Sequence, residues 1–334
     1  MLDKRRLHGH VSPPGYLLFV IALFLMGFLS FWMLIIGCPE SSLLTTEVTV
    51  PGYILLVPDN VSTIPVPYSL NDLPSTDEST LIDIKNFKFT INHDPCNKTQ
   101  PLLLMLIHSA PGNFAKRNVV RDTWGKQTPE MVVLFLVGAT LDYQADLNKE
   151  NNKYQDIIQG NFIDAYRNMT YKHVMALKWA TYHCPTMIDF LKHGLSPWGA
   201  RRLILCDPLS TGVVKRSWRS KWRVSPQEYP GRRYPAYCAG WAILYSPDSV
   251  FLLYKEAQRE PYFWIDDVHI TGTVARKVNL THSSLHSLVL KNEDMEELLS
   301  NPNVHREFLF GPPNLAENHI KALHYLSQSN KVWQ

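Results

Sequence analysis

The longest apolar stretch of the chain covers residues 16–37, "YLLFVIALFLMGFLSFWMLIIG", and contains no charged side chain. As a helix it is long enough to cross a hydrocarbon core of ~30 Å, so it predicts a membrane span. Lys4, Arg5 and Arg6 precede it, which favours a cytosolic tail over residues 1–15 and a lumenal C-terminal part. The alternative is a cleaved signal peptide, but its apolar region is usually ~7–15 residues and ends in a small-x-small site, which does not follow here.

Residues 38–84 carry six prolines among serines, threonines and aspartates. Proline prevents regular helix, so this segment is predicted to be a semi-extended stem. The alternative is the start of the folded domain, because "YILLV" could form a strand, but Pro51 and Pro58 lie too close on either side for a central one. A lumenal domain is therefore expected over residues 85–334, ending in a helical extension.

The hydrophobic pattern then alternates between strand and helix. Residues 84–91 show the period of a half-exposed strand, whereas the unbroken run "PLLLMLIHS", 101–109, is typical of a strand buried on both faces. A helix is predicted over 115–124, a second buried strand over 131–138 and a polar helix over 142–154. This order predicts an α/β domain with a mostly parallel central sheet.

The same order continues towards the C-terminus. Residues 171–184 have apolar side chains at helical spacing, and "RLILCD", 202–207, is typical of a strand. Ser246 followed by Pro247 places an N-cap and a first-turn proline at the start of another helix.

The composition and charge of the chain limit which kinds of molecule it is expected to bind. With 45% hydrophobic and 19% charged residues and a net charge of +3, the chain has no long basic surface for nucleic acid. The segment 214–225 does interleave basic residues with Trp218 and Trp222, a pattern that also suits single-stranded nucleic acid. In a lumen, stacking on the sugar rings of a glycan is the favoured interpretation, with core packing of one tryptophan as the alternative.

The cysteines and sequons agree with the secretory pathway. Cys38 adjoins the span, and the other four cysteines lie where disulfides persist, in three possible pairings. A zinc site is not favoured, because there is no C-x-x-C pair. Four N-x-S/T sequons begin at Asn60, Asn97, Asn168 and Asn279.

Two groups of residues are candidates for chemistry. The loop 109–113 follows a buried strand, and Arg117 and Arg121 come next at i, i+4, where they would clamp a diphosphate or else remain solvated. Asp266 and Asp267 have three interpretations: a general base, ligands of Mg²⁺ or Mn²⁺, or helix N-terminal acids that favour the dipole.

Four ordered blocks carry a resemblance: "SAPGNFAKRNVVRDTWG", "YQDIIQGNFIDAYRNMTYKHVMALKWATYHCP", "SKWRVSPQEYPGRRYPAYCAGWAILYS" and "WIDDVHITG". They resemble the β-1,3-galactosyltransferase and β-1,3-N-acetylglucosaminyltransferase family of type II Golgi enzymes. The resemblance implies a GT-A-like lumenal fold in the Golgi membrane, a UDP-sugar donor and a Mn²⁺ ion. It also implies transfer of galactose or N-acetylhexosamine, with inversion, to a hydroxyl of an acceptor glycan on protein or lipid.

The resemblance also assigns roles by position. Asp267 would be the catalytic base, with Asp266 beside it. The donor nucleotide-sugar would be bound by Arg117, Arg121, Trp124, Asp164 and Lys172. The acceptor side rests on residue types and not on the resemblance: it is predicted for Trp222, Tyr237, Gly240 and Trp241, of which Gly240 would let a ligand approach the backbone closely.

One part of the family pattern is missing. An acidic triplet, in a pattern like K-x-D-D-D, should follow Cys184 and Pro185, but here Thr186 leads directly into "MIDFLKHGLSPWG". The metal ligands therefore remain unknown, with Asp189 and Asp207 as substitutes to consider. A metal on the leaving phosphates supplies several kcal/mol, and each ~1.4 kcal/mol is tenfold in rate, so its loss should leave only weak activity.

The missing segment also corresponds to a central strand, and losing several buried side chains at ~1.5–3 kcal/mol each would weaken the fold. Three hypotheses remain open: a working hexosyltransferase that recruits other acids, a non-catalytic Golgi protein that binds an active transferase, and a lectin. An oligomer with itself or with other transferases is also left open.

Overall fold

The computed structural model describes residues 68–97, 101–185, 202–210, 212–301 and 304–329. The predicted cytosolic tail, the predicted span over 16–37 and the greater part of the predicted stem lie outside these ranges. Within them, no helix combines the length and apolar character that crossing a membrane requires.

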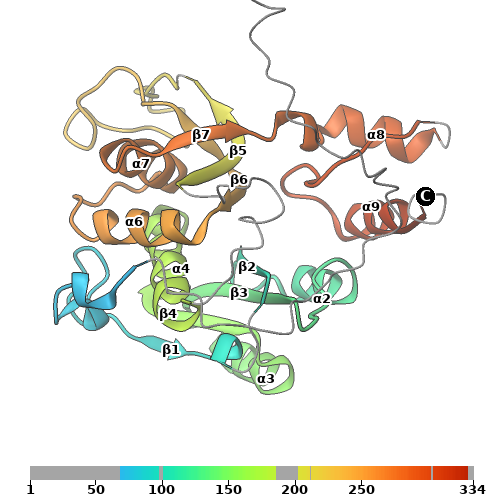
Figure 1. The fold of residues 1–334 in the computed structure, drawn as a ribbon. Coiled ribbons are helices and arrows are strands. Elements are labelled where there is room, and N and C mark those ends of the chain that lie inside the picture. Colours follow the sequence, from blue (N-terminus) through green and yellow to red (C-terminus); the bar gives the residue numbers. More distant parts are fainter. Residues whose placement is uncertain (1–67, 98–100, 186–201, 211, 302–303, 330–334) are drawn as a thin grey trace, which may run out of the picture. The chain divides into compact units, whose positions relative to one another are not determined.

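The first sheet has the strand order β1-β4-β3-β2 (Figure 1). Strands β2, β3 and β4 are parallel, and β1 is antiparallel to β4. Their bounds are β1 (Phe89–Ile91), β2 (Leu103–His108), β3 (Met131–Ala139) and β4 (Ile157–Ile163). Strand β3 is buried along most of its length, as its apolar run predicts, and β1 is shorter than the strand expected over residues 84–91.

The second sheet has the order β6-β5-β7. Its strands are β5 (Leu203–Leu209), β6 (Tyr237–Tyr245) and β7 (Thr281–Ser284). Strand β5 is parallel to β7 and antiparallel to β6, so three of the five strand pairings in the two sheets are parallel. A mixed α/β fold with mostly parallel pairs agrees with the fold class expected from the sequence.

The expectation of one central sheet is wrong for the described residues, because the strands form two sheets. Strand β2 pairs with β3 on one side only, so it is an edge strand. Its side chains are half-buried and Leu103 is exposed, which corrects the prediction that this run is buried on both faces. An edge strand has a neighbouring strand on one side only, so its side chains have fewer neighbours to cover them.

The helices follow the predicted order. The predictions over 115–124, 142–154 and 171–184 are confirmed to within two residues at each end. The helices are α2 (Phe114–Asp122), α3 (Gln144–Tyr154), α4 (Met169–His183), α6 (Pro247–Ala257), α7 (Ala275–Lys277), α8 (Asn292–Ser300) and α9 (Glu317–Ser329). Ser246 is the N-cap of α6 with Pro247 at its first position, as predicted. Its hydroxyl bonds the side chains of Asp248 and Ser249 and accepts from the Leu203 backbone N–H, but it caps no backbone N–H of the helix.

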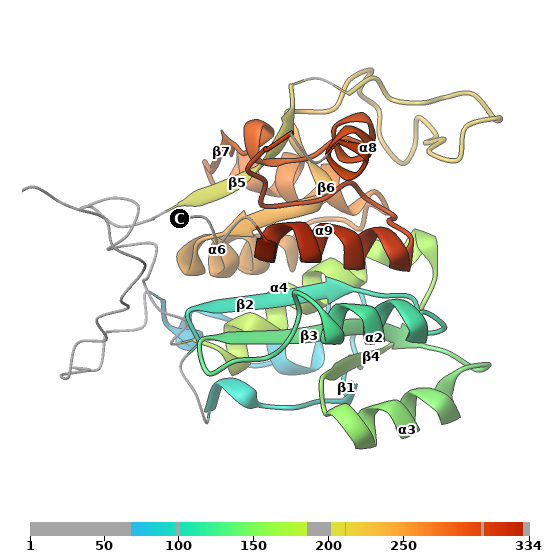
Figure 2. The ribbon, with the colours of Figure 1, turned by 90° about the vertical axis from the view of Figure 1, so that its right-hand side faces the viewer.

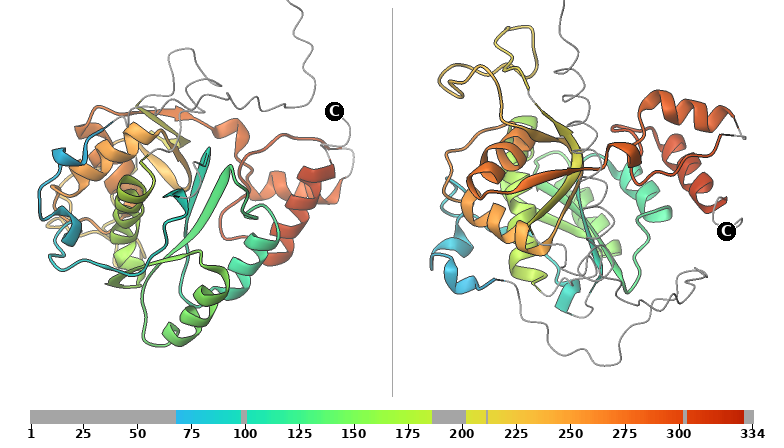
Figure 3. Two further views of the ribbon diagram at one scale, coloured as in Figure 1. Left: turned by 60° about the horizontal axis from the view of Figure 1, so that its bottom comes forward. Right: turned by 45° about the horizontal axis from the view of Figure 1, so that its top comes forward.

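Helix α4 is buried on nearly all sides. Its Trp179 belongs to one hydrophobic core together with Leu134 of β3, Ile158 of β4 and Ile204 of β5, so a single core joins the two sheets. The C-terminal helix α9 packs beside α2, as Figures 1 and 2 show. Both views in Figure 3 place the red helices α8 and α9 on the α2 side of the fold.

The described end of the predicted stem, residues 68–84, is folded. Leu81 is fully buried in the main core, and the buried Asp77 carboxylate accepts hydrogen bonds from Tyr182, Tyr254 and Gln258. These residues therefore belong to the domain that was expected to begin at residue 85, because their apolar and charged groups find partners on α4 and α6.

The structure has two disulfides, which correspond to one of the three pairings that the sequence left open. Cys96 pairs with Cys184 at the end of α4, and Cys206 of β5 pairs with Cys238 of β6. The first disulfide joins cysteines that are 88 positions apart in the sequence. The second connects the antiparallel strands β5 and β6 of the second sheet.

Candidate functional site

Asp266 and Asp267 lie at the start of a helical segment that continues as a π-helix over Val268–Val274. The Asp267 side chain accepts a hydrogen bond of 2.7 Å from the Val268 backbone N–H, and its backbone oxygen accepts one from the Thr271 hydroxyl at 2.6 Å. The interpretation as helix N-terminal acids is therefore right for their position. It does not exclude chemistry, since π-helical segments are frequent at functional sites.

Asp266 is held by a histidine that the sequence analysis did not select. Its Oδ2 lies 3.1 Å from Nδ1 of His173 on α4, and the other ring nitrogen of His173 lies 3.1 Å from the Tyr245 hydroxyl on β6. The His108 ring of β2 packs edge-on against His173 at 5.4 Å between centroids. In the sequence, His173 stands out only as a polar residue on a helix with many apolar positions. Such a histidine is more often a hydrogen-bonded core residue than a residue of a functional site.

The two carboxyl groups differ in acidity. Burial would raise the pKa of Asp266, but the hydrogen bond and charge of His173 prevail and lower it. Burial and the charge of the neighbouring Asp266 raise the pKa of Asp267 to about 6. A carboxylate with a pKa near the working pH is suited to general-base catalysis, and such shifts concentrate at functional sites.

The structure places two of the predicted acceptor residues next to Asp267. A Cβ atom at Gly240 would lie 3.0 Å from Cβ and 3.2 Å from Oδ2 of Asp267, so a larger residue there would press on the base. Tyr237 lies on the same strand, and burial followed by the charge of Asp267 raises its pKa. Gly240 and Tyr237 are therefore brought together with the candidate base.

The two tryptophans of the basic segment lie on the surface. Trp218 and Trp222 have exposed fractions of 76% and 46%, so the core-packing alternative is wrong for both. The Trp222 indole N–H donates to the Tyr166 hydroxyl at 3.0 Å. Trp241 instead lines a separate cavity with residues of the C-terminal part.

Asp164 and Lys172 meet where the parallel strands end. The Lys172 ammonium group lies 2.8 Å from the Asp164 carboxylate and donates to the Ser109 carbonyl at 2.8 Å. Asp164 also accepts from the Gly138 backbone N–H at 2.6 Å. These contacts join the residues that follow β2 and β4 to the end of β3, and ligands of open α/β sheets bind at this carboxyl edge.

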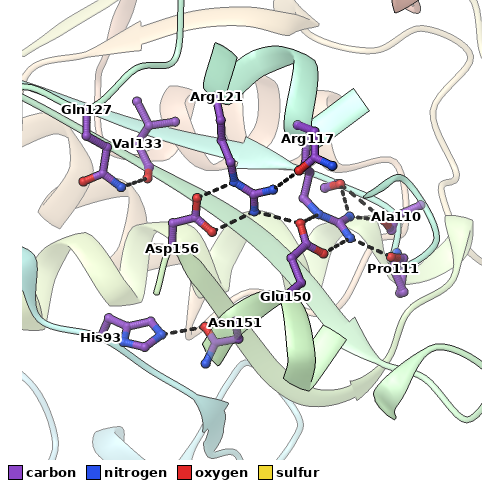
Figure 4. A network of polar contacts seen from close by, with 12 residues as sticks. His93, Ala110, Pro111, Arg117, Arg121, Gln127, Val133, Glu150, Asn151 and Asp156 are labelled. Atoms are coloured by element: carbon purple, nitrogen blue, oxygen red, sulfur yellow. Dashed lines mark hydrogen bonds and ion pairs between the residues drawn. The ribbon is translucent and has the colours of Figure 1, made fainter. Parts of the chain in front are cut away.

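Arg117 and Arg121 form a buried network with two acids, shown in Figure 4. Arg117 is 1% exposed, and its N–H groups donate to both oxygens of Glu150, to the Ser109 hydroxyl and to the carbonyls of residues 110 and 111. These are five bonds, the full capacity of a guanidinium group. Arg121 bonds both oxygens of Asp156 and lies 2.7 Å from Glu150.

The alternative that these arginines are solvated is wrong. Their contacts also limit what they can donate to a diphosphate. Arg117 has no N–H left for a phosphate in this arrangement, and its bonds shape the loop that begins at Ser109. Trp124, the third residue assigned to this block, is 42% exposed. Its role in donor binding stays a prediction.

The asparagines of three sequons fall within the described residues. Asn97 and Asn279 are exposed, whereas Asn168 is half-buried and its side-chain amide donates to the Ile163 carbonyl at 2.8 Å. Asn60 lies outside the described residues.

A manganese site was tested against the side chains that the structure describes. No three His, Cys, Asp or Glu side chains in the described ranges are grouped to hold a metal ion. Asp266 is bonded to His173, and Asp207 pairs with His286 at 2.9 Å. The described residues therefore do not fit a manganese site, and Asp189 lies outside them.

Comparison with known proteins decides the family. The model of the galactosyltransferase family matches residues 115–193 and 188–286, about half of the chain. The chain belongs to the galactosyltransferase family. The first matched segment contains Arg117, Asp164 and Lys172, and the second contains Asp266 and Asp267.

Curated relatives agree with this assignment. β-1,3-Galactosyltransferase 5 of Gorilla gorilla gorilla is 30% identical over 246 residues, covering 66% of this chain and 80% of the relative. The Homo sapiens protein of the same name is 29% identical over 245 residues, covering 66% and 76%. β-1,3-Galactosyltransferase 2 of Mus musculus is 27% identical over 216 residues, covering 57% and 51%. The glycosyltransferase class predicted from the sequence is confirmed.

The two segments of the family match overlap at residues 188–193. This overlap lies a few residues after Cys184 and Pro185, where the family's acidic triplet is missing from the sequence.

Proposed function

We propose that this galactosyltransferase-family chain transfers galactose or an N-acetylhexosamine from a UDP-sugar to a glycan hydroxyl, forming a β-1,3 linkage with inversion. The observation that carries the proposal is Asp267, a half-buried carboxylate whose pKa is raised to about 6 and which adjoins Gly240 on a strand that also bears Tyr237.

In this mechanism Asp267 accepts the proton of the acceptor hydroxyl while that oxygen attacks the anomeric carbon of the donor. The bond between this carbon and the diphosphate oxygen breaks on the opposite face, and its electron pair leaves with UDP. The proton ends on Asp267, and the configuration inverts. The ionised Asp266, held by His173, keeps Asp267 basic enough to take part.

The donor is proposed to bind at the carboxyl edge of β2, β3 and β4. The loop that begins at Ser109 lies there, together with the buried ion pair of Asp164 and Lys172. In this proposal Arg117 and Arg121 position that loop, since their own donors are engaged by Glu150, Asp156 and the loop itself.

The proposed location is the Golgi membrane, with a single type II span over residues 16–37 and a lumenal catalytic domain. The apolar span after a basic tail and the exposed sequon asparagines support this location. Two disulfides, Cys96–Cys184 and Cys206–Cys238, support an oxidising compartment.

The test is transfer by the full chain in detergent, assayed with UDP-galactose and with UDP-N-acetylhexosamines, with Mn²⁺ added, against a panel of β-linked glycans. Replacing the base by Asp267→Asn should lower turnover by roughly 10²–10⁴-fold. Asp146→Asn is the matched control, because this carboxylate is largely exposed and its ion-pair partner among the described residues is the exposed Lys149. Equal turnover of Asp267→Asn and the wild type would remove Asp267 as the base.

A second candidate function is a non-catalytic Golgi protein that binds an active transferase. The saturated guanidinium group of Arg117, which offers no donor to a diphosphate, favours it. It predicts no product from the folded wild-type chain with any donor, and an unchanged cellular glycan profile when Asp267→Asn replaces the wild type. Co-purification with a transferase would then identify the partner.

A further inference from the structure

A cavity of about 190 Å³ lies among the second sheet and the segments that follow it. Asp267 does not line it. Its walls come from β5, from β6, from the segment leading into α8 and from the loop before α9, so segments far apart in sequence build it together.

The cavity is apolar on one side and polar on the other. Trp241, Pro312 and Pro313 supply apolar surface, and Lys291 and Asn292 supply polar groups.

Asp207 of β5 is a further polar group of the cavity. It bonds His286 through Oδ1 at 2.9 Å, and among the described residues its Oδ2 has no hydrogen-bond partner. This oxygen is therefore available to accept a bond from a ligand.

Backbone contacts fix the walls relative to one another. The Leu285 N–H donates to the carbonyl of Cys206 at 2.7 Å, which ties the C-terminal segment to β5. The Leu290 N–H donates to the Phe310 carbonyl at 2.9 Å, which holds the loop before α9 against the start of α8. A site assembled before its ligand arrives loses less entropy on binding.

We propose that this cavity binds one hexose residue of a glycan. A pyranose has a C–H face that packs on an indole and on proline rings, and hydroxyls that bond carboxylate, amide and ammonium groups. The volume is below the ~300 Å³ at which drug-sized ligand sites begin, so a single ring suits it better than a nucleotide-sugar. The negative charge of Asp207 is opposed by the positive charge of Lys291, so the cavity favours a neutral ligand over an ion.

The inference rests on the proposed function only in taking the acceptor glycan as the natural source of this residue. Trp241 directly follows Gly240, the residue of β6 whose backbone adjoins Asp267, so one strand supplies both a wall of the cavity and a neighbour of the candidate base. A sugar bound there would hold the acceptor without taking part in the reaction.

The test is saturation-transfer NMR on the full chain in detergent, titrated with methyl β-D-galactopyranoside. Saturable binding is expected, weakened at least tenfold by Trp241→Ala and several-fold by Asp207→Ala. Asp146→Ala is the matched control for Asp207→Ala, because this carboxylate is largely exposed on α3 and does not line the cavity, and it should leave the affinity unchanged. A thermal melt of each variant shows that it is folded, and Asp207→Ala decides the question if Trp241→Ala does not fold.

The inference is overturned if binding does not saturate, if both cavity variants keep the wild-type affinity, or if Trp222→Ala removes binding while Trp241→Ala does not. Asp267→Asn separates this inference from the proposed function, because it should abolish transfer and leave the sugar affinity intact. Wild-type chain that binds the sugar through Trp241 but gives no product would refute the proposed function and leave this site standing.

Discussion

Two charge clusters of this protein, one buried around Arg117 and one half-buried around Asp267, are built in opposite ways. In the first sheet, the charges of Arg117 and Arg121 are balanced by Glu150 and Asp156, and the Arg117 donors are fully used. Beside the second sheet, the adjacent carboxylates of Asp266 and Asp267 lie near one histidine, His173. Of the two, Asp266 contacts it.

The clusters differ in acidity for the same reason. Burial opposes the ionised form of Glu150, but Arg117 and Arg121 prevail and lower its pKa. Asp267 has no such cation, so burial and the charge of Asp266 raise its pKa. A balanced cluster holds structure, whereas an unbalanced one leaves a group able to exchange a proton near neutral pH.

The largest expected effect comes from breaking the balanced cluster. Arg117→Met leaves Glu150 short of a partner and the carbonyls of residues 110 and 111 without their donor. Loss of one partner of a buried ion pair costs about 3–5 kcal/mol of unfolding free energy. Urea unfolding of the full chain measures it, and a loss below ~1 kcal/mol would show that this network does not hold the fold.

Relieving the unbalanced cluster should have the opposite sign. The folded-state pKa of Asp267, about 6, lies above its unfolded value, so its contribution to stability is present at low pH and is lost as pH rises through 6. Asp267→Asn should therefore be more stable than the wild type above pH 6, by at most about 3 kcal/mol, and no more stable below pH 4. Parallel unfolding curves at pH 4 and pH 7.5 check this, and a variant that is less stable at pH 7.5 would contradict it.

A smaller change should sharpen the contrast within the acid pair. His173→Gln removes the hydrogen bond and charge that lower the pKa of Asp266. The half-buried His108 nearby has a pKa lowered to about 3 by desolvation and stays neutral. The apparent pKa values of the coupled acids should rise, and the acid limb of turnover should move to higher pH. Carboxyl ¹³C NMR of labelled aspartates follows the same titration without activity. An unmoved titration would show that His173 only packs.

The smallest effect is expected at an exposed pair that belongs to neither cluster. Lys149 and Asp146 on α3 are mostly exposed and lie 3.3 Å apart, so solvent screens them. Lys149→Ala should change the unfolding free energy by less than ~0.5 kcal/mol in the same urea experiment. An effect as large as that of Arg117→Met would mean that burial does not set the difference between the pairs.

The order of strands and helices was predictable because each long element carries its own pattern. Residues 131–138 and 142–154 are a continuous apolar run and a polar helix, and both form as expected. The strand Ile157–Ile163 was missed as an element, since its glutamine, glycine and asparagine hide the apolar run. The division into two sheets could not be predicted either, because strand pairing depends on distant segments.

The candidate site was predictable in part. Asp266 and Asp267 stand out as adjacent acids, and the four ordered blocks give the family. His173 and Tyr245 were not selected, because Asp266 lies 93 positions from its partner His173, and His173 lies 72 positions from its partner Tyr245. The sequence also gave no sign that Arg117 is saturated, since the Glu150 that binds it lies on a different helix.

The sequence by itself determined the family, through four ordered motif blocks that resemble it. It also determined the order of strands and helices and the residue types that can carry chemistry, because these follow from composition and from local periodicity. The tertiary structure decided which cysteines pair, which arginines are neutralised and which carboxylate keeps a raised pKa. Each of these depends on burial and on charges a few ångströms away in space but tens of residues away in the chain, and neither distance is written in a local pattern.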